Sequence, residues 1–146
     1  MILFLDFDGV LHPMMALTEL GTFDNLPRLE NVLRDFVNVK IVITSSRREH
    51  SSLSTLSQNF SSDIASRIIG ATPILRLQNA EDIVESRYRE IMAYMDGRSE
   101  RWVALDDDAT LFPQNYSELI LCNDGFHQTE EDALRVALLK TNYFST

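Results

Sequence analysis

The sequence has one cysteine, few lysines and no long apolar run. Its 146 residues contain a single cysteine, Cys122, so no internal disulfide can form, which fits a reducing compartment. No apolar stretch approaches the roughly 20 residues that cross a bilayer. The apolar run that starts at residue 2 follows no charged leader and no cleavage site, so we expect no secretory signal. These absences predict a cytoplasmic protein without a membrane segment.

Acidic residues outnumber basic ones by 22 to 13, which gives a net charge of −9. Proteins that bind nucleic acid non-specifically usually carry the opposite balance, so we expect no such binding. The chain is 45% hydrophobic and 24% charged. It shows no repeat, linker or low-complexity tract, so we expect one soluble domain over residues 1–146.

Apolar periodicity predicts strands that alternate with helices along the whole chain. The expected strands cover residues 2–5, 39–43, 68–70, 102–105 and 119–122. The expected helices cover residues 27–37, 49–60, 63–67 and 79–95, and a closing helix begins at a capping box over 129–132. Asn79 is expected to cap the fourth helix and Gly97 to end it, while residues 14–26 are irregular with a turn at Gly21. This alternation is typical of an α/β fold: a doubly wound, mainly parallel five-stranded sheet with helices on both faces.

Three of the predicted strands end in side chains that can carry chemistry. The pairs are Asp6/Asp8, Thr44/Ser45 and Asp106/Asp107. The carboxyl ends of parallel strands share one edge of the sheet, where open α/β folds bind ligands, so we expect these pairs to meet. Neighbouring carboxylates repel unless a cation lies between them, and hard oxygen ligands suit Mg²⁺. The alternative is that these acids only cap strands and begin turns.

Four short motifs follow one another in a fixed order. They are Asp6-Phe-Asp8-Gly9-Val10, Ile43-Thr44-Ser45-Ser46, a basic helix residue and Leu105-Asp106-Asp107. This order resembles the haloacid dehalogenase (HAD) superfamily of phosphohydrolases over residues 2–108. The segments Asp-x-Asp-Gly-Val-Leu-His-Pro, Ser-Ser-x-Arg, Arg-x-x-Glu-Ile and Trp-Val-Ala-Leu-Asp-Asp are similar to those of a small, capless group found as domains of multi-domain RNA-repair proteins. Neither gap between the motifs has room for a folded cap domain.

The resemblance implies a nucleophile, a general acid–base and a metal site. Asp6 would attack phosphorus and form an aspartyl-phosphate, while Asp8 would protonate the leaving oxygen and later deprotonate water. By the same resemblance, Mg²⁺ would bind Asp6, Asp106 and the backbone carbonyl of Asp8, and Asp107 would act through water. The cation would shield the anionic nucleophile from the anionic phosphate. Asp108 receives no role.

Hydroxyl groups after the second strand are the expected phosphate ligands. Counting from the last apolar strand residue points to Thr44, whereas the small-residue triplet of the superfamily points to Ser45, which we favour. Either hydroxyl could instead cap the following helix. Ser46 and Arg47 would complete substrate binding. Arg47 and Arg48 could bind a second phosphate or an anionic leaving group, or they could form a solvated start of the next helix.

The superfamily also places a cation before its last motif. No lysine occurs between Lys40 and Lys140, so this cation must be an arginine. Arg87 fits best, through Arg-x-x-Glu-Ile, and Arg89 is the alternative; on a helix the two point to different faces. Arginine offers a bidentate fork to phosphate. His12 lies just past the first motif and could touch the substrate, but we interpret it as a bystander.

We therefore predict a Mg²⁺-dependent phosphatase of the HAD type that acts through an aspartyl-phosphate. An open site suits a large or exposed phosphomonoester, at a nucleic-acid end or on a phosphoprotein, and a small one if a partner subunit supplies a lid. The alternative is a catalytically silent binding or regulatory module with the same fold. A phosphate-accepting receiver domain is disfavoured, because the fifth strand ends in Cys122-Asn123 with no lysine nearby. Sequence does not determine the oligomeric state.

Overall fold

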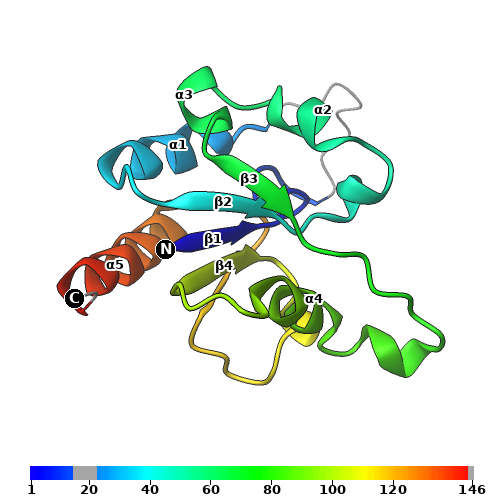
Figure 1. Cartoon of the computed structure of the whole chain (residues 1–146). Helices are drawn as coiled ribbons and strands as arrows, with labels where there is room; N and C mark the ends of the chain where they lie inside the picture. Colours follow the sequence, from blue (N-terminus) through cyan, green and yellow to red (C-terminus); the bar gives the residue numbers. More distant parts are fainter. Residues whose placement is uncertain (15–22, 145–146) are drawn as a thin grey trace.

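A computed structural model describes residues 1–14 and 23–144 of the chain. Its centre is a five-stranded sheet in the order β3-β2-β1-β4-β5, and each neighbouring pair of strands is parallel (Figure 1). The strands are β1 (Ile2–Leu5), β2 (Lys40–Ile43), β3 (Ile68–Ala71), β4 (Trp102–Asp106) and β5 (Leu119–Leu121). The predicted α/β fold with a parallel five-stranded sheet is confirmed, and within the described residues no folded cap stands over the sheet.

Strand β1 lies in the middle of the sheet because its four residues are apolar and fully buried. Such a continuous apolar run is typical of a parallel strand that is covered on both faces. Leu3 and Leu5 face one apolar cluster, and Ile2 and Phe4 face the other. The predicted placement of helices on both faces is therefore confirmed.

The two faces carry different helices (Figure 1). The Leu3 face is covered by α1 (Leu26–Asp35), α2 (Leu53–Ser57), α3 (Ser62–Ala65) and α5 (Gln128–Phe144). The Phe4 face is covered by α4 (Ser86–Met95), through Ile91 and Met95. None of the described helices is long and apolar enough to cross a membrane.

Two predicted helices are wrong in their extent. The stretch 49–60 is not one helix but a 3₁₀ turn, η1 (Ser46–Glu49), followed by the short α2. Serine explains the break: the Ser45 and Ser52 side chains each accept a backbone N–H bond and begin a separate element.

The stretch 79–95 is likewise divided. The expected capping box of Asn79 and Asp82 is present, but it caps a 3₁₀ turn, η2 (Ala80–Ile83). Glu85 then adopts a left-handed conformation with φ 59°, and its N–H donates to the carbonyl of Thr110 at 3.0 Å. This tertiary hydrogen bond stands where a continuous helix would place an intrahelical one. Helix α4 starts after it and ends before Gly97, as predicted.

The ends of other elements shift by smaller amounts. Helix α5 begins at Gln128, and the Glu130 carboxylate accepts from the His127 N–H at 3.1 Å, so the capping box expected over 129–132 is wrong. The expected turn at Gly21 lies in residues 15–22, outside the described residues. A third 3₁₀ turn, η3 (Ala109–Leu111), follows β4.

Arg67 joins the end of α1 to the start of β2. Its guanidinium donates to the carbonyls of Leu33 at 2.7 Å, Phe36 at 2.6 Å and Val39 at 2.9 Å. Leu33 lies in the last turn of α1, and Phe36 and Val39 follow that turn, so the guanidinium adds charged donors where helical hydrogen bonding ends.

We expect Arg67→Ala to destabilise the fold by about 2–3 kcal/mol, because three carbonyls lose a charged donor at once. Arg67→Lys should restore only part of this, since one ammonium cannot reproduce the planar fork. Urea unfolding monitored by circular dichroism measures the effect. Arg76→Ala, at an exposed arginine, is the control. An Arg67→Ala effect no larger than that of the control would contradict the assignment.

Candidate active site

The carboxylates at the ends of β1 and β4 meet at one edge of the sheet. The Asp6 N–H donates to the Leu105 carbonyl at 3.1 Å, which extends the pairing of β1 with β4 by one residue. As a result, Asp6, Asp106 and Asp107 each place a carboxylate oxygen within 4.8 Å of the others. The convergence expected of Asp6, Asp106 and Asp107 is present, and this group of oxygens could hold a metal ion.

Gly9 allows Asp107 to approach the loop after β1. Its φ of +79° is a conformation that side-chain-bearing residues rarely adopt. A Cβ atom at this position would lie 2.1 Å from Oδ2 of Asp107. The glycine in the first motif therefore provides both the turn and the space that the third carboxylate occupies.

Burial sets the protonation of the two inner carboxylates. Asp6 is 7% exposed and Asp106 1% exposed. Burial, together with the negative charge of Asp106, raises the pKa of Asp6 well above its ordinary value, although Arg87 opposes this. Burial likewise raises the pKa of Asp106 to about 6, against the effect of Arg87. Both groups are thus costly to ionise at neutral pH unless more positive charge is present.

The donor set fits a hard divalent cation. It consists of carboxylate oxygens, which Mg²⁺ prefers, and these oxygens lie within 4.8 Å of one another. The guanidinium of Arg87 pairs with Asp6 and Asp106, so a cation would offset the negative charge that remains in the cluster.

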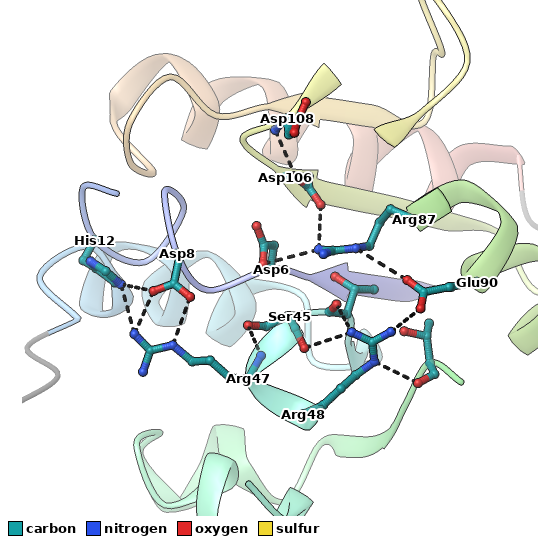
Figure 2. A network of polar contacts seen from close by, with 12 residues as sticks. Asp6, Asp8, His12, Ser45, Arg47, Arg48, Arg87, Glu90, Asp106 and Asp108 are labelled. Atoms are coloured by element: carbon teal, nitrogen blue, oxygen red, sulfur yellow. Dashed lines mark hydrogen bonds and ion pairs between the residues drawn. The ribbon is translucent and has the colours of Figure 1, made fainter. Parts of the chain in front are cut away.

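Arg87 lies at the acidic cluster, whereas Arg89 does not. Arg87 Nη1 is 3.0 Å from Asp106 Oδ2 and 3.4 Å from Asp6 Oδ1 (Figure 2). Burial lowers the pKa of Arg87, but Asp106 and Asp6 outweigh it and hold that pKa above its ordinary value. Arg89 is exposed and donates to the Asp82 carbonyl of η2. Of the two arginines left open by the sequence, the geometry therefore selects Arg87.

Asp8 is directed toward a different set of partners (Figure 2). Arg47 donates to both of its oxygens, from Nε at 3.1 Å and from Nη2 at 2.7 Å, and His12 Nε2 lies 2.8 Å from Oδ1. The hydrogen bond from Arg47 lowers the pKa of Asp8. Arg47, expected at the substrate, thus pairs with Asp8 in this structure, and its guanidinium also lies 5.2 Å above the ring of Phe23.

His12 is the residue that the sequence interpretation missed. It is 6% exposed and in contact with Asp8, so it is not a bystander. The turn through Gly9 brings His12 back beside Asp8, and the two residues form a β-bridge. The i, i+4 spacing of an acid and a histidine around a glycine turn was the available indication.

The segment after β2 contributes backbone and hydroxyl groups. Ser45 is fully buried, and its hydroxyl accepts the Arg47 N–H at 3.2 Å as the N-cap of η1. Thr44 is also buried, with its N–H bound to the Leu5 carbonyl at 3.0 Å. Ser46 is exposed at the first position of η1. The phosphate-binding roles of these three residues stay predictions.

Asp108 has a local structural contact. Its N–H donates to Asp106 Oδ1 at 3.0 Å, and its own carboxylate accepts from the N–H and the hydroxyl of Thr110 at the start of η3. This accounts for the third aspartate in the run without a role in chemistry.

One family model matches the chain. It is described as the HAD domain in Swiss Army Knife RNA repair proteins, and it covers residues 2–133. No curated protein and no solved structure is a significant match. HAD domains are generally hydrolases, phosphatases among them, and they typically use Mg²⁺. The matched range contains every site residue described above.

We expect Mg²⁺ to raise the Tm of the wild type and Gly9→Ala to abolish this rise, because the new methyl group would displace Asp107. Gly97→Ala is the matched control: its φ is +77°, but nothing lies within 4 Å of the added Cβ. Both substitutions should cost about 1–2 kcal/mol from backbone strain. Thermal unfolding with and without millimolar Mg²⁺ separates them. Equal Mg²⁺ responses in the two variants would refute the role of Gly9.

Asp6→Asn should stabilise the metal-free protein at neutral pH. Folding raises the pKa of Asp6 above 3.8, so ionisation of Asp6 destabilises the fold; this cost is absent below pH 3.8 and grows until the folded-state pKa is passed. We expect a gain of roughly 1–2 kcal/mol, or a few degrees in Tm, at pH 7.5 and none near pH 4.

Calorimetric scans in chelator from pH 4 to 8 measure this gain. Asp108→Asn, which changes charge by the same amount at an exposed residue, is the control. A lower Tm for Asp6→Asn at pH 7.5 would show that ionised Asp6 is not a burden on the fold.

Proposed function

The chain belongs to the family of HAD domains in Swiss Army Knife RNA repair proteins, and we propose that it is a Mg²⁺-dependent phosphomonoesterase acting through an aspartyl-phosphate on Asp6. The observation that carries this proposal is the meeting of Asp6 with Asp106, Asp107 and Arg87 at the carboxyl edge of the sheet. A nucleophile, a group of metal-binding oxygens and a phosphate-binding cation then lie together.

Asp6 acts first as the nucleophile. One of its carboxylate oxygens attacks phosphorus, a bond from that oxygen to phosphorus forms, and the bond from phosphorus to the leaving oxygen breaks. Asp6, Asp106 and the backbone carbonyl of Asp8, with Asp107 acting through water, would hold Mg²⁺, which would offset the charge between carboxylate and phosphate. Arg87 binds a phosphoryl oxygen and orients the group for attack.

Asp8 moves the protons of both steps. It donates a proton to the leaving oxygen, and then, as a carboxylate, takes one from the water that hydrolyses the aspartyl-phosphate. In the free site Asp8 is a carboxylate held by Arg47 and His12. We infer that Arg47 exchanges Asp8 for an anionic oxygen of the arriving substrate, which leaves Asp8 free to carry a proton. Ser45, with Thr44 as its rival and Ser46 beside it, holds a further phosphoryl oxygen.

The substrate we favour is a phosphorylated nucleic-acid end. Within the described residues no folded cap stands over the site, which suits a large substrate, and the matching family is that of RNA repair proteins. A net charge of −9 opposes non-specific binding along a strand, so recognition would be confined to the end. A phosphoprotein is the alternative substrate, and a cytoplasmic location is proposed from the single buried Cys122.

We expect the protein to release phosphate from an aryl phosphate in Mg²⁺ and to lose that activity in chelator. Asp6→Asn should reduce the rate by at least about 1,000-fold, because it removes the nucleophile, and Asp108→Asn should leave it within a factor of a few. A continuous assay of the released phenolate measures this. Activity that survives Asp6→Asn, or that needs no divalent cation, would contradict the mechanism.

Substrate preference is measured separately. Oligonucleotides with 5′- or 3′-phosphates and phosphopeptides are compared by kcat/KM under the same conditions. A higher kcat/KM for phosphopeptides would make a phosphoprotein, and not a nucleic-acid end, the proposed substrate. Absence of turnover on all of these, with phosphate binding retained, would favour the catalytically silent module.

A further inference from the structure

Glu90 lies between two buried arginines, and the mechanism above assigns it no role. It sits on α4 one turn after Arg87, and its side chain is 11% exposed. Glu90 Oε2 is 2.5 Å from Arg48 Nη2, and Glu90 Oε1 is 3.8 Å from Arg87 Nε. Figure 2 shows the carboxylate between the two guanidinium groups, with Arg87 continuing toward Asp6 and Asp106.

Arg48 anchors this arrangement to the sheet. Its side chain is 6% exposed, and besides Glu90 it donates to four backbone carbonyls. These carbonyls belong to Thr44 (2.7 Å), Ser45 (3.0 Å), Thr72 (3.0 Å) and Pro73 (3.2 Å). An arginine side chain has five N–H groups, and here five acceptors receive them. Arg48 therefore joins the ends of β2 and β3 to α4 through Glu90, and it has no freedom to act on a substrate.

Glu90 provides the counter-charge on the far side of Arg87. Arg87 Nη1 points to Asp106 and Asp6, while Arg87 Nε is buried and has no hydrogen-bond partner among the described residues. The guanidinium thus lies between opposing carboxylates: the two aspartates at one end and Glu90 at the other. Among the described residues, no hydrogen bond from Arg87 Nη2 is found.

Loss of the Glu90 charge would alter this balance. With aspartates on one side only, Arg87 would be drawn toward them and away from the position of the phosphoryl group. Arg48 would keep a buried positive charge without its carboxylate partner, at a cost to stability. The first effect concerns chemistry and the second concerns folding, so they can be measured apart.

We propose that Glu90, held by Arg48, is a positioning residue that keeps Arg87 oriented with its Nη2 group available to a phosphoryl oxygen. The inference rests on the proposed function, since it concerns the same phosphate, and it adds two residues that touch no reacting atom. It also assigns a role to Arg48 in the Ser-Ser-x-Arg segment and to Glu90 in the Arg-x-x-Glu-Ile segment.

The test compares Glu90→Gln with Glu30→Gln. Glu30 is a matched control because it is 5% exposed and its carboxylate accepts from the Ser61 N–H at 2.7 Å and the Ser61 hydroxyl at 2.8 Å, on the other face of the sheet. Both variants should lose stability. Glu90→Gln alone should lower kcat for an aryl phosphate about 10–100-fold and weaken the binding of inorganic phosphate in Mg²⁺ by a similar factor.

A double-mutant cycle with Arg87→Met then distinguishes positioning from a general structural role. If Glu90 acts through Arg87, Glu90→Gln should change phosphate affinity about twofold or less in the Arg87→Met background. Arg48→Lys provides a second variant in case Glu90→Gln does not fold. It keeps the charge but loses donors, and it should show the same defect in kcat and in phosphate binding.

Three outcomes overturn the inference. One is a Glu90→Gln variant whose kcat and phosphate affinity match those of Glu30→Gln. Another is a full Glu90→Gln effect that persists without Arg87. In both cases an active wild type leaves the proposed function standing. The third is a wild type that neither hydrolyses an aryl phosphate nor binds phosphate, which overturns the proposed function and the inference with it.

Discussion

Repulsion between buried carboxylates is the constraint on which the rest of this site depends. Asp6, Asp106 and Asp107 offer oxygens within 4.8 Å of one another, and two of these residues are almost inaccessible to water. Water cannot offset the charge of these carboxylates there. The protein instead places a guanidinium and a backbone N–H beside them, and their arrangement suits a divalent cation. The elements that look incidental around the edge, such as the Gly9 turn and the Asp108 N–H, bring these groups to the required positions.

Charges alternate in sign from the acidic cluster into the sheet. Asp106 faces Arg87, Arg87 faces Glu90, and Glu90 faces Arg48. Each buried charge therefore has an opposite neighbour, which makes its burial tolerable, and each also restricts the orientation of the next. Beside this row, Asp8 forms a separate group with Arg47 and His12. The two carboxylates of the first motif, only two residues apart, thus lie in contrasting surroundings: burial raises the pKa of Asp6, and Arg47 lowers that of Asp8.

Sequence predicted the parts of this arrangement that follow from strand topology. Apolar runs that end in Asp6 and Asp106 are enough to place both acids at one edge, because parallel strands share a direction. The parts that it missed depend on contacts between distant segments. The break at Glu85 needs the carbonyl of Thr110, and the pairing of Asp8 with Arg47 joins residues 39 positions apart. Helical periodicity distinguishes the faces of Arg87 and Arg89 but does not say which one meets the acids. The sequence analysis named Glu90 only as part of the Arg-x-x-Glu-Ile segment, because its contact with Arg48 joins residues 42 positions apart.

The pairing of β1 with both β2 and β4 has a consequence for how the protein matures during synthesis. Asp6 leaves the ribosome 81 residues before Arg87 and 100 residues before Asp106. Until β4 adds beside β1, Asp6, the proposed nucleophile, lacks the neighbouring carboxylates of Asp106 and Asp107. Under the proposed function, chains that stop before β4 would therefore be inactive, and reactivity of Asp6 would report that β4 has docked beside β1.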